Sequence, residues 1–452
     1  MEHDSTDAAL VRAVLGAVGD EVAELAEWLV GHRGGDLREL EGGLTERGHR
    51  LLTRMLGVAL AARASEGARG AAQCRGCGAS GVWLRGRPKT LHLLLGDVPL
   101  RRDAGYCAGC RRGWAPLDEQ LGIDQSGRSP RLVEAVALLG TEFAFGVAGE
   151  RLERVCGVWL GASQAEAVTE GVGLALAEQR DVAATAALDP KAASVPVAVG
   201  PKEAELPWLV ILLDGVFVRH RGTGYQEVKV AALTRAGPSS DPADGRAPRT
   251  GRWRYVVETG SLERFGRLVW HQAQQLGAEA AERVLVIADG AAWIWKLADF
   301  YFPRAMRLLD YWHAVQHLWA LGAARFGAGD RRIPAWVGTA KARLARGEAD
   351  ALRAGWERAT PADAAAFAEE LTYFRNQAPK LAYDAARADG MPIGSGAVES
   401  ANRHVVGVRV KQPGMRWTEP GLRGVLTLRA LLRSGAWDDW WDTHALPIQL
   451  TA

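Results

Sequence analysis

The chain has 452 residues, of which 48% are apolar and 24% are charged, and its formal net charge is +2. This composition is typical of an ordinary soluble protein, and the length allows two or three domains with at least one sizeable core. The longest apolar runs, such as LVILL and VLVIA, are far too short to span a bilayer. The acidic start MEHDSTD has neither the basic nor the apolar part of a secretory signal, so we expect a cytoplasmic protein.

Charge is distributed unevenly along the chain. Residues 1–70 contain 12 acidic residues and 8 arginines, whereas residues 71–115 contain 8 basic residues and 2 aspartates. Residues 400–433 contain 7 basic residues and one glutamate. Two basic segments in a nearly neutral protein are compatible with a polyanionic partner, although solvated surface charge would give the same pattern.

The first 70 residues predict a helical region. Apolar residues recur at helical spacing up to Gly34 and Gly35, and a second helix is expected from about Leu37 to Ala64. No residue type in this region indicates chemistry. We interpret residues 1–70 as a module for packing or dimerisation.

Residues 71–116 change character, with short strand-like pieces between two cysteine pairs. Four of the five cysteines form two Cys-x-x-Cys pairs separated by 29 residues: Cys74, Cys77, Cys107 and Cys110. Two such pairs on adjacent hairpins complete a tetrahedral Zn²⁺ site, as in a zinc ribbon. A redox pair is the alternative, but no thioredoxin-like pattern surrounds either pair. Four thiolate ligands leave no open position, which favours a structural site, and Cys156 is expected in the core.

Residues 117–190 predict a helical region with a possible helix-turn-helix. A helix near 148–156 is followed by a glycine-containing turn, and Ser163 is a candidate cap for a second helix. That second helix carries Glu166 and Glu170 and no basic residue, so both DNA reading and helix-pair packing stay open. Residues 191–206 are rich in proline and alanine and read as a linker.

Residues 207–319 predict an α/β unit. In chain order, the pattern gives three strands, a helix, a strand, a helix, and a short strand that leads into another helix, at 208–220, 225–236, 253–260, 261–277, 283–291, 292–302 and 305–321. Residues 320–390 are almost wholly helical. Three antiparallel strands followed by helix-linked parallel strands are what a ribonuclease-H-like fold requires. We therefore expect a catalytic domain of that fold at 207–319, an all-helical insertion at 320–390, and the rest of the domain with C-terminal basic helices at 391–452.

Two aspartates end apolar strands of this unit. Asp214 follows LVILL, Asp289 follows VLVIA, and a glycine comes after each. Each alone could be a cap or a surface residue. Neighbouring strands lie roughly 5 Å apart, and carboxylates that close repel each other unless a cation lies between them. Mg²⁺ fits such a site, and two ions about 3.5–4 Å apart would need a third carboxylate.

The third carboxylate has two candidates, Asp310 in LLDYWH and Glu399 in GSGAVES. Asp310 begins an Asp-x-x-His set with His313, and His317 lies one helical turn further on. A metalloprotease motif is discounted because HAVQH lacks its glutamate. In GSGAVES, no Gly-Lys-Ser/Thr follows, which excludes a nucleotide-binding P-loop. We expect the glycines to form a turn and Ser395 to cap the helix that carries Glu399.

Several strings carry a resemblance to a known family. They are CRGCG, PLDEQLGI, LLDGVFVR, EVKV, ADGAAWIW, LLDYWHAVQHL, PIGSGAVESANRHVVGVRVKQPGMRW and LRALLRS, and they extend from about residue 70 to 440. On these strings the chain resembles the DDE transposases of bacterial insertion sequences, of the ISKra-type group, with Mutator-like transposases as more distant relatives. The resemblance implies a catalytic triad of Asp214, Asp289 and Glu399, with Asp310 and His313 in support.

The resemblance also implies a chemistry and partners. The triad would hold two Mg²⁺ (or Mn²⁺) ions for DNA cleavage and strand transfer, and the protein would act as a homo-oligomer on terminal inverted repeats and target DNA. Residues expected to bind DNA phosphates are Arg403, Arg409, Lys411 and Arg416. Trp417 or His404 could stack on an unpaired base. Two alternatives stay open: a non-catalytic DNA-binding regulator or domesticated transposase descendant, and a ribonuclease-H-like nuclease that does not join strands.

Overall fold

The computed structural model describes residues 2–67, 72–74, 76–189, 191, 193, 195–239 and 248–444. Parts of the predicted linker 191–206 and the end of the predicted region 391–452 lie outside the described residues. The chain divides into two compact units, Met1–Ala175 with Asp438–Ala452, and Leu176–Trp437. Across the described ranges, we find no helix whose length and apolar character would let it cross a membrane.

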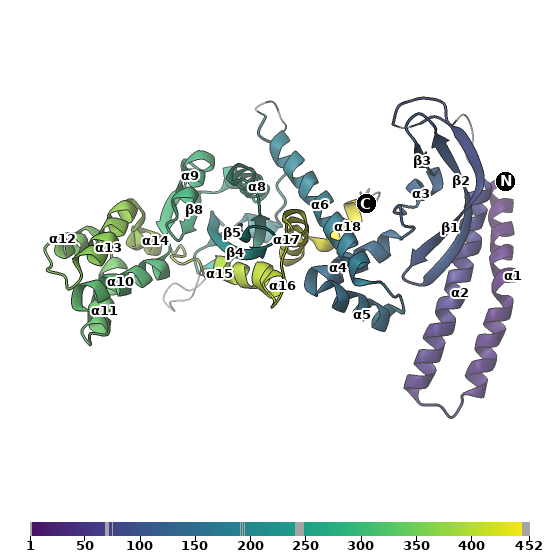
Figure 1. The fold of residues 1–452 in the computed structure, drawn as a ribbon, viewed down its shortest axis with the longest axis horizontal. Coiled ribbons are helices and arrows are strands. Elements are labelled where there is room, and N and C mark those ends of the chain that lie inside the picture. Colours follow the sequence, from purple (N-terminus) through teal and green to yellow (C-terminus); the bar gives the residue numbers. More distant parts are fainter. Residues whose placement is uncertain are drawn as a thin grey trace. The chain divides into compact units, whose positions relative to one another are not determined.

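The first unit begins with two antiparallel helices, α1 (Glu2–Gly31) and α2 (Leu37–Ser65) (Figure 1). The side chain of Asp36 accepts a hydrogen bond from the Glu39 amide at 2.8 Å, which satisfies one free amide at the start of α2. The predicted second helix, 37–64, is confirmed to within one residue.

Helix α2 packs against a three-stranded antiparallel sheet made of β1 (Val82–Leu93), β2 (Gly96–Cys107) and β3 (Arg112–Trp114). The alternation of side chains along β1 and β2 places one apolar face against the helix. The core of this packing is Leu60, Leu91, Leu93, Val98 and Leu100. The two cysteine pairs lie at the other end of the sheet, beside β3 and the start of β1.

The remaining helices of the first unit are α3 (Pro116–Gln120), α4 (Pro130–Glu142), α5 (Phe145–Cys156), most of α18 (Trp437–His444), and the first part of α6 (Ala162–Ala186). Helix α5 ends at Gly157, whose φ of 70° is readily adopted by glycine. The predicted cap at Ser163 is wrong, because α6 already begins at Ala162. The Gln164 side chain instead accepts the Gly161 amide at 3.2 Å. Cys156 is only half-buried, so its prediction as a core residue is also wrong.

The second unit is built on a mixed six-stranded sheet. Its strands are β4 (Trp208–His220), β5 (Gly224–Gly237), β6 (Arg249–Thr250), β7 (Arg254–Glu258), β8 (Arg283–Ala288) and β9 (Met306–Leu309). The order is β6-β5-β4-β8-β9, and β7 pairs with β5 beside β6. β5 is antiparallel to β4, whereas β8 is parallel to both β4 and β9. The apolar runs of β4 and β8 are buried, as expected for central parallel strands.

Helices surround this sheet (Figure 1). They are α7 (Pro201–Ala204), α8 (Leu262–Gln275), α9 (Ala292–Tyr301), α14 (Tyr383–Ala388), α15 (Gly396–Ala401), α16 (Val408–Val410) and α17 (Glu419–Arg433), with short 3₁₀ turns η2 (Ala278–Ala280) and η3 (Ala378–Lys380) and a π-helical segment η4 (Asn402–Gly407). Helix α15 packs against β4 and β5, and α8 packs against β5 and β7.

A separate group of helices lies beyond β9 in the chain. It consists of α10 (Tyr311–Phe326), α11 (Ile333–Leu344), α12 (Ala349–Glu357) and α13 (Ala364–Gln377), which pack on one another (Figure 1). These helices occupy most of the range that the sequence predicts to be helical, 320–390. The chain therefore leaves the sheet after β9 and returns to it at α15.

Candidate active site

Three aspartates stand at the same level of three adjacent parallel strands. Leu213 of β4 pairs with Ala288 of β8, and Ala288 pairs in turn with Leu309 of β9. The next residue of each strand is an aspartate: Asp214, Asp289 and Asp310. Clefts outside the carboxyl ends of parallel strands are common binding sites in α/β proteins. Asp214 does not end its strand, as the sequence suggested, because β4 continues to His220 in its pairing with β5.

These aspartates share a cavity of about 150 Å³ with Glu399 of α15. The cavity is lined by four carboxylates, Asp214, Asp289, Asp310 and Glu399, and by His313 and Gln316 of α10. The structure thus brings the predicted triad and both supporting residues together. Their catalytic roles stay a prediction.

The Asp214 carboxylate is held by two donors. The Gly215 amide donates to Oδ1 at 2.7 Å, and the Asn402 side chain donates to Oδ2 at 2.5 Å. Burial raises the pKa of Asp214 to about 6, and the negative charges of Asp289 and Glu399 add to the effect. Holding this group ionised at neutral pH therefore costs free energy in the absence of a cation.

The turn that carries Asp289 is fixed from the helical group. Tyr373 of α13 donates its hydroxyl to the Asp289 carbonyl at 3.0 Å, and Gln377 donates to the Gly290 carbonyl at 3.0 Å. Gly290 has a φ of 101°, and a Cβ at this position would lie 2.9 Å from the Tyr373 hydroxyl. The glycine after Asp289 is therefore required both by the backbone conformation and by the close approach of α13.

Asp310 differs from the other carboxylates in the cavity because both of its oxygens hold backbone amides. The residue is only 1% exposed, and its side chain accepts the His313 amide at 2.6 Å and the Ser395 amide at 2.5 Å. It therefore caps α10 and fixes the segment before α15. The Ser395 side chain makes no capping bond to α15, contrary to the expectation from the sequence.

Glu399 projects from the first turn of α15 and is exposed. Among the described residues, its carboxylate has no hydrogen-bonding or ion-pair partner, in contrast to that of Asp310. Of the two candidates for a third metal ligand, Glu399 is therefore the one whose oxygens are uncommitted. This contrast favours Glu399 on geometric grounds.

The two histidines of α10 have different surroundings. His313 lines the cavity, and burial together with neighbouring His317 lowers its pKa, so the imidazole is neutral at neutral pH. His317 stacks on Tyr373 with ring centroids 3.6 Å apart, and its Nδ1 lies 2.8 Å from a Glu370 oxygen. His313 therefore lines the cavity with Asp214, Asp289, Asp310 and Glu399, whereas His317 pairs with Glu370.

A π-helical segment, η4, follows Glu399 closely and contains Asn402 at its start. Arg429 of α17 is fully buried, and its guanidinium donates to the carbonyls of His404 and Val405 within this segment. A π-bulge leaves carbonyls without their usual helical partners, and such bulges recur at functional sites. Asn402 and Arg429 are site residues that the sequence reasoning missed, and Asn402 stands three residues after Glu399, on the same helical face.

The predicted phosphate-binding residues divide into two groups. Arg403, Lys411 and Arg416 are exposed, as is His404. Arg409 is fully buried near the ring of Trp417, so its prediction as a DNA contact is wrong. Trp417 is only 6% exposed, and its indole nitrogen donates to the Val410 carbonyl, so it is a core residue rather than a stacking surface.

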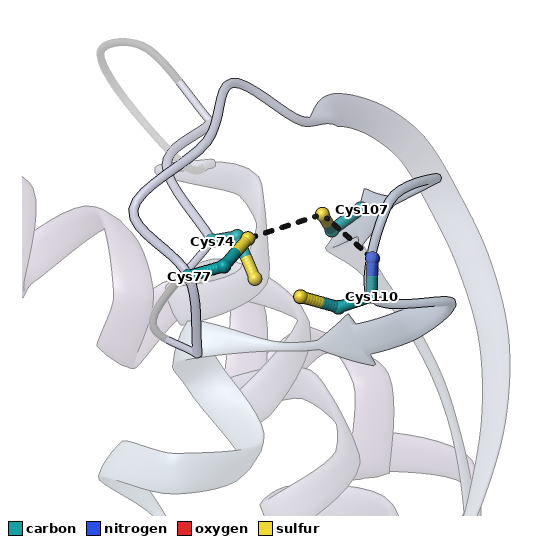
Figure 2. A group of neighbouring side chains, drawn as sticks. All are labelled: Cys74, Cys77, Cys107 and Cys110. Atoms are coloured by element: carbon teal, nitrogen blue, oxygen red, sulfur yellow. Dashed lines mark hydrogen bonds between the residues drawn. The ribbon is translucent and has the colours of Figure 1, made fainter.

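The four paired cysteines converge at one end of the first unit's sheet (Figure 2). Their sulfur atoms all lie within 4.8 Å of one another. The Gly76 and Cys77 amides lower the pKa of Cys74 to about 7, whereas the neighbouring Cys77 and Cys74 sulfurs raise the pKa of Cys110 to about 12. Four thiolates cannot all ionise so close together without a cation. The set fits a structural Zn²⁺ ion.

The carboxylate cavity fits a metal in its donor chemistry, since Mg²⁺ prefers carboxylate oxygens. Its ligand atoms are less tightly gathered. In the described ranges, the four cysteines alone form a group of three or more ligands with all atoms within 4.8 Å.

Comparison with known proteins adds little to this geometry. No protein-family model and no curated protein matches the chain. One solved structure with similarity is the Drosophila P element transposase strand transfer complex, which is 9% identical with a TM-score of 0.25. The similarity covers 71% of this chain and 83% of that chain. A TM-score this low does not support a conclusion about fold or activity.

Proposed function

We propose that this chain is a DDE transposase that cleaves DNA at the ends of an insertion sequence and joins those ends to target DNA. The observation that carries the proposal is the placement of Asp214, Asp289 and Glu399 around one cavity, two of them at the same level of adjacent parallel strands. Without the short strand β6, the pairing runs β7-β5-β4-β8-β9, with β5 antiparallel to both β7 and β4. This arrangement supports a ribonuclease-H-like core. The domain boundaries given above belong to this proposal.

The triad Asp214, Asp289 and Glu399 would hold two Mg²⁺ ions. Bound there, the ions would activate a water molecule or a DNA 3′-hydroxyl for attack on the phosphodiester and would stabilise the leaving oxygen. The chain's own residues prepare the site. Asn402 holds the Asp214 carboxylate, and α13 fixes the turn after Asp289. Burial, together with the charges of Asp289 and Glu399, raises the pKa of Asp214, and a bound cation would offset both effects.

DNA is the proposed partner, bound as terminal repeats and target. The exposed side chains of Arg403, Lys411 and Arg416 follow Glu399 in the chain and would neutralise backbone phosphates. The cysteine cluster would hold one structural Zn²⁺ ion in a zinc ribbon that contributes to DNA binding. Transposition pairs two DNA ends, so we propose a homo-oligomer.

The test uses the purified full chain, Mg²⁺ and a duplex ending in the inverted repeat that this proposal expects beside its gene. The variants Asp214→Asn, Asp289→Asn and Glu399→Gln should each lose nicking and strand transfer while retaining DNA binding. Glu279→Gln, an exposed acid of η2 outside the cavity, is the matched control and should cleave like the wild type.

The outcomes separate the possible functions. Cleavage at the wild-type rate by any one of the three triad variants would contradict the assignment. Hydrolysis without joining would indicate a nuclease, and binding without metal-dependent cleavage would indicate a regulator.

A further inference from the structure

Helix α10 exposes two tryptophans on one face. Trp312 is 54% exposed and Trp319 is 46% exposed, and Gln316 lies exposed between them. Residues at i, i+4 and i+7 share a helix face, and seven residues span about 10.5 Å along the axis. The buried apolar residues of α10 include Tyr311, Ala314, Val315, Leu318 and Leu321. The Trp312–Gln316–Trp319 strip is therefore not part of the core.

The strip begins at the carboxylate cavity. Gln316 lines the cavity, and Trp312 stands in the chain between the cavity residues Asp310 and His313. A Cβ on Gly394 would lie 3.1 Å from Cδ1 of Trp312, so the glycine lets the backbone before α15 lie against the indole edge. The strip and the cavity are thus continuous.

A cation accompanies the aromatic surface. The amine of Lys341, on α11, lies 4.5 Å from the Trp312 ring centroid. This contact orders the ring by a cation–π interaction and brings a positive charge to the strip. A flat aromatic surface next to a cation suits a ligand with planar rings and negative charges.

We propose that the Trp312–Gln316–Trp319 strip binds unpaired nucleobases of the DNA strand whose phosphodiester enters the carboxylate cavity. Duplex DNA hides the faces of its bases, whereas an unpaired strand offers them for stacking on indole rings. The span of about 10.5 Å is long enough for the strip to contact more than one nucleotide. Gln316 would hydrogen-bond to base edges, and Lys341 would neutralise a phosphate.

The assignment rests on the proposed function for the position of the phosphodiester. It also moves the stacking role from Trp417, which is buried, to tryptophans that the sequence did not single out. The signal that could have singled them out is the helical spacing, which places both tryptophans outside the face made by Ala314, Leu318 and Leu321.

The test measures affinity for a fluorescent oligothymidylate and for a matched duplex, without Mg²⁺ so that cleavage plays no part. Trp312→Ala and Trp319→Ala should each weaken single-strand binding about 5- to 150-fold, the range expected for loss of one stacked base. Trp312→Phe and Trp319→Phe should restore most of the affinity. Phe300→Ala removes a 76% exposed aromatic side chain from α9, in the same unit but outside the strip and the cavity, and should change nothing.

Unchanged single-strand binding by both alanine variants, with wild-type thermal stability, would overturn the inference even if the protein transposes DNA normally. If the alanine variants differ from the wild type in sedimentation coefficient but bind DNA equally well, the inference would also be overturned. The strip would then be identified as a protein interface. Conversely, a wild-type protein that binds single strands through the strip but never cleaves would contradict the proposed function alone.

Discussion

Replacing Asp214 with asparagine removes a carboxylate whose ionised form lowers the stability of the folded protein. Burial and the charges of Asp289 and Glu399 raise its pKa from an ordinary 3.8 to about 6. The folded protein therefore binds a proton more tightly than the unfolded chain does. The stability that this proton provides is complete below the unfolded pKa and is lost as the pH rises through the folded pKa.

The size of the effect follows from that difference. A pKa difference of about two units corresponds to about 3 kcal/mol of unfolding free energy. At pH 7.5 the magnesium-free protein, with Asp214 ionised, is less stable by this amount than it would be with Asp214 protonated. The asparagine introduced at this position would carry no charge, but its single oxygen could accept from only one of the two donors, Gly215 and Asn402, at a loss of about 1 kcal/mol. The Asp214→Asn variant should therefore be more stable than the wild type by about 2 kcal/mol.

Thermal unfolding in a zinc-containing buffer without magnesium measures this gain. At pH 7.5 we expect the midpoint to rise by roughly 4–8 °C, given about 2–4 °C per kcal/mol for a unit of this size. At pH 5, where most folded wild-type molecules carry the proton, the electrostatic part should fall by about half, so the net gain should shrink to roughly a third of its value at pH 7.5. Added Mg²⁺ should stabilise the wild type and the control Glu279→Gln but leave Asp214→Asn unaffected.

Two results would refute this reasoning. The first is a variant equal to or less stable than the wild type at pH 7.5 without magnesium. The second is a gain of the same size at both pH values, because a contribution independent of pH cannot come from the ionisation of Asp214.

Further predictions concern other residues. Asn402→Ala removes the amide donor to Asp214, so single-turnover nicking should fall about 10- to 150-fold, as for a hydrogen bond to a charged group; an unchanged rate would show that the contact is dispensable. Cys110→Ser should abolish the one bound zinc per chain, measured by elemental analysis, whereas retained zinc would exclude the four-cysteine site. Arg416→Ala should lower the salt dependence of DNA binding by about one phosphate contact, and an unchanged salt slope would exclude such a contact. Arg409→Ala should instead lower the thermal midpoint, since Arg409 is buried, and a purely DNA-binding defect would contradict that placement.

The sequence predicts those parts of the structure that local patterns determine. Helix α2 and strand β8 are predictable nearly to their observed ends, because helical spacing, an apolar run and adjacent glycines mark them. The proximity of Asp214 and Asp289 is also predictable, since each follows a buried apolar run. That Asp310 stands at the same level depends on the pairing of β8 with β9, which no local pattern encodes.

Other features depend on partners distant in the chain. The basic run after Glu399 reads as surface, yet Arg409 and Trp417 pack into the core while several of their neighbours face solvent. The π-helical segment at Asn402 is held by Arg429, whose position in space the sequence does not reveal. Hence the role of Asn402 could not be predicted, although the residue lies within a recognisable motif.

Glu399 lies beside Asp289 although 109 residues separate them in the chain. The helical group between β9 and α15, which accounts for most of these residues, explains how the chain returns. Asp310 caps α10 with one oxygen and holds the Ser395 amide with the other, and the Tyr311 amide donates to the Ile393 carbonyl at 3.0 Å. The chain therefore leaves and rejoins the sheet at one point.

Because both ends are fixed there, the length of the excursion has little influence on where Glu399 lies, just as long loops add little to the entropy of closure. The excursion also has a direct role at the site. Tyr373 and Gln377 reach back from α13 to the carbonyls of Asp289 and Gly290. The helical group thus fixes the turn after Asp289, and Asp310 at its start fixes the segment that leads to Glu399. Shortening α13 should therefore disturb the site, even though α13 contributes no carboxylate to it.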